Sequence, residues 1–106
     1  MNADKFTQKT IETIQTAQSM AQENGNQYLT PEHLLYALVD ADGGLIGTLL
    51  GRMGVDCNAV LSELDTAIDR LPKVSGGSGE VYASPETGKI FNFAEREAKN
   101  SGDAYV

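Results

Sequence analysis

Two side chains in this sequence could together form a nucleophile and its base. Cys57 is the single cysteine and His33 is the single histidine. An imidazole activates the thiol in Cys/His hydrolases, and a position near a helix start lowers the pKa of a thiol. A simpler interpretation makes Cys57 a small residue in a first helical turn and His33 a capping or packing residue beside Leu34 and Leu35. We therefore expect no catalytic residue and keep a small thiol enzyme as a third hypothesis.

Phosphate-binding loops and metal sites need residues at spacings that this sequence lacks. Gly88-Lys89 resembles the end of G-x-x-x-x-G-K-[ST], but Ala83 replaces the first glycine and Ile90 replaces the Ser/Thr. The run from Gly76 to Gly79 follows no predicted strand, so we interpret it as a loop. With one histidine and one cysteine, a metal site would need carboxylates as its further ligands, and no ligand spacing in the sequence supports such a site. We expect neither a metal nor a cofactor in this chain.

Three polar residues could bind a partner without doing chemistry. Glu32 could hold a cationic ligand beside a helix start, although a solvated carboxylate that complements the helix dipole is the simpler explanation. Asp103 lies at a predicted turn and Thr7 lies near the start of the first predicted helix. For both residues a local backbone role is the simpler explanation and surface recognition is the alternative.

Three apolar residues in the C-terminal third are candidates for an exposed contact. Phe93 lies off the apolar stripe of its predicted helix, so it either covers a second side of the core or is exposed for binding. Val81 and Tyr82 stand beside the glycine-rich segment, where apolar side chains are candidate contacts for a peptide.

Composition bounds the class of protein. The chain has 106 residues, 41% of them hydrophobic and 22% charged, which is typical of one globular domain. Its net charge of −7 argues against binding to nucleic acid or to an anionic membrane, because both need a basic surface. A single cysteine suits a reducing compartment, and the polar Met1–Lys9 segment lacks the apolar region of a signal peptide. We expect a cytoplasmic protein.

Helical periodicity and helix-end signals divide the chain into five helices. Thr30, Asp56 and Ser84 are predicted N-caps, while Gly25, Gly54 and Gly102 close helices. No segment alternates like a half-buried strand, so we predict an all-α helical repeat bundle. The predicted helices are Asn2–Asn24, Pro31–Val39, Leu45–Met53, Cys57–Leu71 and Pro85–Ser101.

An internal repeat relates the first predicted helix to the fifth. A shift of 77 residues, the separation of Thr10 and Thr87, aligns identical residues at several buried-face and turn positions. They are Thr10 with Thr87, Ala17 with Ala94, Ala21 with Ala98, Gly25 with Gly102, and Tyr28 with Tyr105. Chance similarity of two alanine-rich helices is the alternative, and the shared G-x-x-Y turn argues against it. We predict a first repeat at 1–72, a glycine-rich linker at 73–84 and a truncated second repeat at 85–106.

The truncation has a consequence for the fifth helix. In a repeat protein each unit buries its apolar face against neighbouring helices. Ile90, Phe91 and Ala94 would lack the helices that follow in a complete second repeat. We expect this face either to lie back on the first unit or to pair with another copy of the chain.

The segment Y-L-T-P-E-H-L-L from Tyr28 to Leu35, with its repeat, resembles the N-terminal domain of Clp unfoldases. The segments Arg70–Val74 and Tyr82–Glu86 look like the ClpB disaggregase branch of that family. The resemblance implies an all-helical, two-repeat domain that is flexibly attached to hexameric ATPase modules, where ATP binds. It implies recognition of unfolded or aggregated polypeptides for delivery to the central pore, with co-chaperones or adaptors as further partners.

The same resemblance implies a binding site. Thr7 and Asp103 match surface positions that the ClpB family uses in substrate handling, and an apolar groove between the repeats is the expected docking surface. The alternative function is an adaptor-binding or phosphoarginine-binding domain of a protease-linked relative, in which the position of Glu32 contributes to binding the modified arginine. The ClpB-like linker argues against this alternative.

Overall fold

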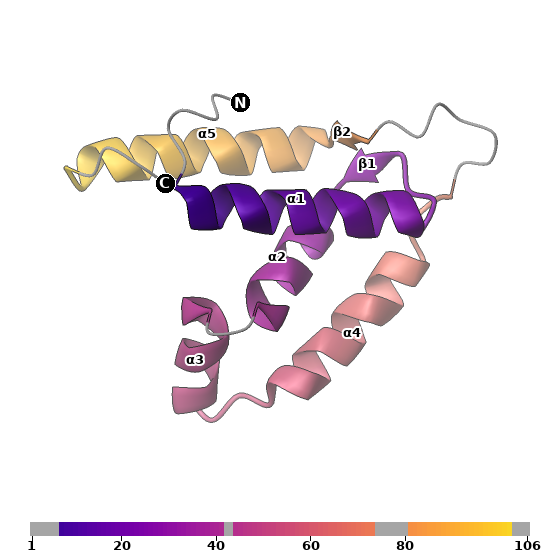
Figure 1. Cartoon of the computed structure of the whole chain (residues 1–106), viewed down its shortest axis with the longest axis horizontal. Helices are drawn as coiled ribbons and strands as arrows, with labels where there is room; N and C mark the ends of the chain where they lie inside the picture. The colour runs from indigo at the N-terminus through magenta and orange to yellow at the C-terminus, as the bar shows by residue number, and fades with distance from the viewer. Residues whose placement is uncertain (1–6, 42–43, 74–80, 103–106) are drawn as a thin grey trace.

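The computed structural model describes residues 7–41, 44–73 and 81–102. Within these residues the chain forms five helices and two short strands (Figure 1), so the predicted all-α fold is confirmed. In chain order they are α1 (Gln8–Glu23), β1 (Tyr28–Leu29), α2 (Pro31–Asp40), α3 (Leu45–Arg52), α4 (Cys57–Asp69), β2 (Tyr82–Ala83) and α5 (Pro85–Asn100).

Local capping sets most helix boundaries where the sequence predicts them. Asp56 accepts hydrogen bonds from the backbone N–H groups at the start of α4, and Ser84 accepts one from Thr87 N–H at the start of α5. Gly25 follows α1 with a φ of 76°, a left-handed conformation that favours glycine. The predicted start of the first helix at Asn2 is wrong, because Thr7 is extended (φ −67°, ψ 161°) and its hydroxyl caps α1.

The two strands are a feature that the sequence did not predict. They pair in parallel, with Tyr28 opposite Tyr82 and Leu29 opposite Ala83. A strand of two residues is too short to show alternating hydrophobicity, so no pattern could have indicated it. β2 forms the end of the predicted linker, and its pairing fastens the segment before α5 to the turn after α1.

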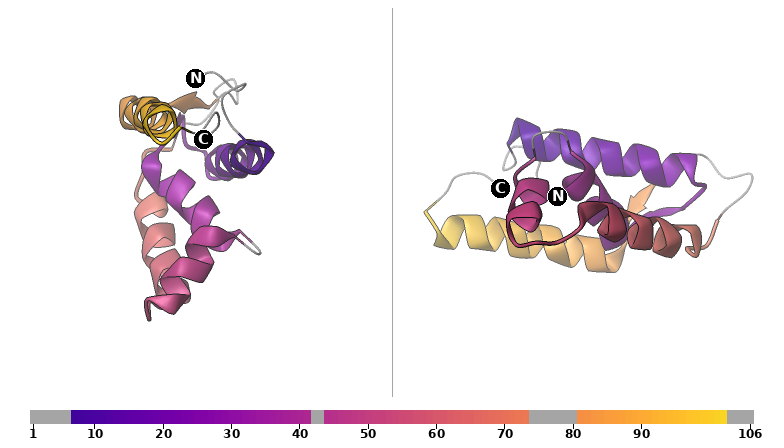
Figure 2. Two further views of the ribbon diagram at one scale, coloured as in Figure 1. Left: turned by 90° about the vertical axis from the view of Figure 1, so that its left-hand side faces the viewer. Right: turned by 90° about the horizontal axis from the view of Figure 1, so that it is seen from below.

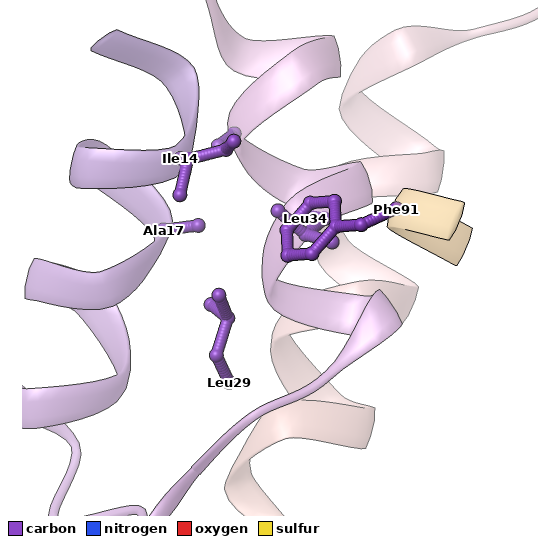
Figure 3. Close-up of a cluster of buried hydrophobic side chains, with 6 residues drawn as sticks. Ile14, Ala17, Leu29, Leu34 and Phe91 are labelled. Carbon is purple, nitrogen blue, oxygen red and sulfur yellow. The ribbon is translucent and has the colours of Figure 1, made fainter. Parts of the chain in front are cut away.

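The helices pack around α2, which contacts both α1 and α4 (Figures 1 and 2). α5 runs antiparallel to α1, and the views of Figure 2 show the two helices apart. The buried cluster draws on α1, β1, α2 and α5 and comprises Ile14, Ala17, Leu29, Leu34, Ala37 and Phe91, with Ile11 and Val81 against it. Figure 3 shows Phe91 reaching from α5 toward Leu34 of α2. Of the face expected to be covered, Phe91 therefore lies back on the first unit, whereas Ile90 stays 43% exposed.

α3 differs from the other helices in its burial. Its apolar stripe predicts a buried face, yet α3 contains no buried residue, and Leu45 and Met53 are 70% and 74% exposed. Periodicity shows which side of a helix is apolar but not whether another element covers that side. Among the described residues no single helix is long and apolar enough to cross a membrane, and only the bent pair of α2 and α3 has such a composition together.

Candidate functional site

The side chain of His33 lies fully buried at the third position of α2. The backbone N–H of Thr30 donates to His33 Nδ1 over 3.0 Å, and the Thr30 hydroxyl lies 2.9 Å from the same nitrogen. A nitrogen that accepts from an N–H carries no proton, so the proton sits on Nε2, which donates to Asn26 Oδ1 at 3.0 Å. His33 thus takes the place of the Glu or Gln of a capping box, and its predicted capping role is confirmed.

Asn26 continues this polar chain to α4. Its Nδ2 donates to the carbonyl of Pro72 over 3.1 Å, while Asn24 Nδ2 donates to Asn26 Oδ1 at 3.0 Å and to the Ile68 carbonyl at 3.3 Å. Asn26 is only 5% exposed, so these bonds satisfy polar atoms that water does not reach. The turn after α1 is therefore held to the start of α2 and to the end of α4.

This geometry leaves His33 without an acid–base role. Burial lowers the pKa of the His33 imidazole, and the neighbouring Glu32 carboxylate opposes that shift only in part. Both ring nitrogens are engaged by Thr30 and Asn26, while the Cys57 thiol points to the carbonyl of Gly47 at 3.6 Å. The two side chains therefore do not form the hydrogen-bonded pair that a thiol hydrolase requires. Within the described ranges, no three His, Cys, Asp or Glu side chains gather in a way that could hold a metal.

A second buried polar contact joins the start of α5 to β1. Thr87 is fully buried, and its Oγ1 donates to the Leu29 carbonyl over 2.7 Å. The backbone N–H of Ser84 donates to the same carbonyl at 3.0 Å, and Ser84 Oγ donates to Thr87 Oγ1 at 3.0 Å. One carbonyl oxygen of the first unit thus receives two donors from the α5 start.

The predicted binding residues lie in separate places. Thr7 caps α1, and Glu32 is partly buried in the first turn of α2. Val81 packs against the core, whereas Tyr82 is 50% exposed on β2 and Phe93 is 60% exposed on α5. Asp103 lies outside the described residues. The structure therefore resolves the two explanations for Phe93 in favour of exposure, and it does not gather these residues into one pocket.

Exposed apolar side chains occur on two parts of the molecule. The first part lies on the strands and α5. Besides Tyr82 and Phe93, it contains Tyr28, which is 47% exposed, and Ile90, which is 43% exposed. The exposure of Tyr28 was not predicted from the sequence. Its position next to Leu29, which is buried in the same strand, is the signal that could have indicated it. The second part lies on α2 and α3 and comprises Leu35, Leu38, Leu45, Leu49 and Met53.

Two hollows lined by described residues are small. One beside Tyr28 and Pro72 has a volume of about 110 Å³, and one between α1 and α2 has about 180 Å³. Pockets for drug-sized ligands usually enclose about 300 Å³ or more. Neither of these two hollows reaches that size.

Comparison with known families and sequences gives a consistent result. Residues 5–106 match the family described as the Clp repeat (R) N-terminal domain. The chaperone protein ClpB of Brucella suis biovar 1 (strain 1330) is 42% identical over 106 residues, which is 100% of this chain and 12% of that protein. ClpB of Vibrio cholerae serotype O1 is also 42% identical over 106 residues, again 12% of its length. The chain therefore spans about an eighth of the length of these relatives.

Solved structures share the fold at low sequence identity. The N-terminal domain (1–163) of the ClpV1 ATPase from E. coli has a TM-score of 0.88 at 19% identity, over 97% of this chain and 62% of that one. The Hsp104 N-terminal domain from Candida albicans has a TM-score of 0.85 at 23% identity, over 95% of this chain and 66% of that one. These likenesses support the helical arrangement alone.

Proposed function

The chain belongs to the Clp repeat (R) N-terminal domain family, and from this membership we propose that it is the substrate-recognition domain of a ClpB-type, ATP-dependent protein disaggregase. In this role it binds unfolded or aggregated polypeptides and passes them to an ATPase ring. The observation that carries the proposal is the match of the whole chain to the N-terminal region of ClpB chaperones at about 42% identity. Hexameric ATPase modules, and the ATP that they bind, belong to the proposed parent protein.

The proposed layout follows the repeat. Residues 1–72 form the first repeat, 73–84 the linker and 85–106 the start of the second, and the parent protein acts in the cytoplasm. The chain itself has a binding role and no catalytic one. Co-chaperones or adaptors are further proposed partners.

The proposed contact surface is centred on the exposed aromatic side chains of β2 and α5. Phe93 and Tyr82 present apolar area to solvent at 60% and 50% exposure, and aromatic side chains supply much of the energy of protein interfaces. An unfolded polypeptide differs from a folded one chiefly in its exposed apolar residues, so an apolar surface discriminates between them. Thr7, Val81, Glu32 and Asp103 are kept as proposed contributors.

The experiment that tests this proposal measures binding of fluorescein-labelled casein, an unfolded protein, by fluorescence anisotropy. We expect the chain extended through a second repeat to bind more tightly than the 106-residue chain, because the groove between repeats is then complete. Phe93→Ser in the extended chain should weaken binding about tenfold. Met53→Ser is the matched control. The Met53 side chain follows α3 and is 74% exposed, and its replacement should leave the affinity for casein unchanged.

Two outcomes would contradict the proposal: equal binding by the two chain lengths, or equal loss from the two substitutions. A phosphoarginine peptide added to the same assay tests the alternative function. If Glu32→Ala abolishes binding of that peptide and Phe93→Ser leaves casein binding intact, the protease-linked alternative is favoured.

A further inference from the structure

The hydrogen bonds between β1 and β2 fix which backbone groups of each strand point outward. The N–H of Tyr82 donates to the Gln27 carbonyl over 3.0 Å, and the N–H of Ser84 donates to the Leu29 carbonyl over 3.0 Å. In a parallel pair, alternate residues of a strand turn their N–H and C=O groups toward the partner strand. Ala83 stands between these two donors, so its own N–H and C=O groups point away from β1.

The outer edge of β1 is covered by the segment that follows α4. Asn26 pairs with Lys73 in a single antiparallel bridge. Because Asn26 precedes Gln27, whose carbonyl faces β2, this bridge lies on the opposite side of the chain from β2. Pro72 also lines the hollow beside Tyr28. Among the described residues no strand pairs with the other edge of the sheet, which belongs to β2.

The edge of β2 is exposed and short. Ala83 is exposed and carries only a methyl group beside its backbone. Pro85 begins α5 two residues later and has no N–H to donate, so the edge ends there. Such an edge offers an incoming strand one donor and one acceptor, both from a single residue. Two hydrogen bonds of this kind give a weak and reversible contact.

From this edge we propose that the chain holds an unfolded polypeptide by its backbone, as a third strand beside β2. The inference rests on the proposed function and names the chemistry by which the surface recognises its substrate. The backbone N–H and C=O groups of an unfolded chain are bonded only to water, whereas secondary structure occupies those of a folded chain. The Ala83 N–H donates to a carbonyl of the polypeptide, and the Ala83 carbonyl accepts from one of its N–H groups. Backbone pairing makes this contact independent of the substrate's sequence.

The exposed phenylalanine of α5 lies within reach of the same polypeptide. α5 follows β2 after Ser84 (Figure 1), and Phe93 lies about 12 Å along α5 from its first residue. An extended polypeptide spans that distance with about four residues. The edge of β2 thus holds the backbone, while Phe93, which is 60% exposed, contacts an apolar side chain. The two contacts use different atoms of the substrate, so each can be removed without the other.

Casein binding, followed by fluorescence anisotropy, tests the backbone contact with a substitution that spares the pairing of β1 with β2. Ala83→Pro removes the outward N–H and keeps the Tyr82 and Ser84 N–H groups that donate to β1. We expect this variant to bind casein about tenfold more weakly than the parent chain. Ala83→Ser is the matched control, because it keeps the N–H and should leave the affinity unchanged. Equal Tm values show that both variants are folded.

The result with Phe93→Ser separates this inference from the proposed function. If Phe93→Ser weakens casein binding and Ala83→Pro does not, the proposed function is retained and the backbone pairing is wrong. If the parent chain does not bind casein, the proposed function is wrong and the inference is wrong with it.

Amide hydrogen exchange in the unmodified chain gives a second readout that does not depend on the folding of a variant. The Ala83 N–H should exchange rapidly in the free chain and about tenfold more slowly with saturating casein. The Tyr82 N–H is the internal reference, because its bond to the Gln27 carbonyl is present with and without casein. An Ala83 N–H that exchanges equally fast in both samples would overturn the proposal.

Discussion

The imidazole of His33 and the carboxamide of Asn26 form a hydrogen bond of 3.0 Å, Nε2 to Oδ1, in a site that solvent does not reach. His33 lies in the first turn of α2, and Asn26 lies in the turn that follows α1. Asn26 Nδ2 donates a hydrogen bond to the carbonyl of Pro72, in the segment that follows α4. A short chain of polar side chains therefore joins three helices. Protonation of His33 and removal of the Asn26 carboxamide should each change the stability of the fold.

The first prediction is a loss of stability in mild acid. Burial lowers the pKa of His33 in the folded chain from its ordinary value of 6.5, so between these two values only the unfolded chain binds the proton. Above 6.5 the stabilisation is complete, and the free energy of unfolding should fall as pH drops from 6.5 toward the lowered pKa. Urea unfolding followed by circular dichroism between about pH 7 and pH 5 measures this slope.

The control for that slope is His33→Gln. Glutamine at the third helical position completes a capping box and does not titrate. Its variant should show a flatter dependence on pH than the parent chain over the same interval. Equal slopes in the two proteins would mean that carboxylates, rather than His33, cause the loss.

The second prediction concerns Asn26→Ala. The substitution leaves the His33 Nε2–H without its partner in a buried site and also removes the part-buried donation to the Pro72 carbonyl, and we expect a destabilisation of about 2–3 kcal/mol. Asn58→Ala is the matched control, because Asn58 is exposed in the first turn of α4, and its cost should stay within about 0.5 kcal/mol. Urea midpoints at constant m-value give both numbers. A similar cost for the two variants would show that the buried amide has no special role.

The third prediction uses two phenylalanines of one helix. Phe91 is 8% exposed in the central cluster and Phe93 is 60% exposed, so alanine at these positions removes the same atoms from different surroundings. Phe91→Ala should cost about 3–5 kcal/mol through lost burial and a residual cavity. Phe93→Ala should change stability by no more than about 0.5 kcal/mol. The opposite order of the two unfolding free energies would contradict the placement of α5.

What the sequence could predict was mainly local. Thr30, Asp56 and Ser84 were identified as caps because each cap interaction spans three residues, and Gly25 marked the end of α1 by its own conformational freedom. The class of fold followed from these signals and from helical periodicity. Phe93 lies off the apolar stripe of its helix. That position was compatible both with exposure and with cover of a second side of the core, so the sequence could not decide between them.

Contacts between distant segments were beyond the sequence. The pairing of β1 with β2 joins two-residue segments that carry no periodic signal. The donation from Thr87 to Leu29 spans 58 positions, and only the recurrence of threonine at position 10 hinted at its importance. The exposure of Leu45 and Met53 on α3 was not predicted, because an apolar stripe does not reveal whether another element covers it.

The fourth prediction is that Thr87→Val loosens α5 more than α1. The substitution removes the 2.7 Å donation to Leu29 and leaves that carbonyl with the Ser84 N–H alone, so a cost of about 1–2 kcal/mol is expected. Because this contact joins α5 to β1, native-state hydrogen exchange should accelerate across α5 while α1 is less affected. Thr66→Val is the control, since its exposed hydroxyl bonds only to the carbonyl of Ser62 within α4. Equal acceleration in α1 and α5 would mean that α5 opens only when the whole chain unfolds.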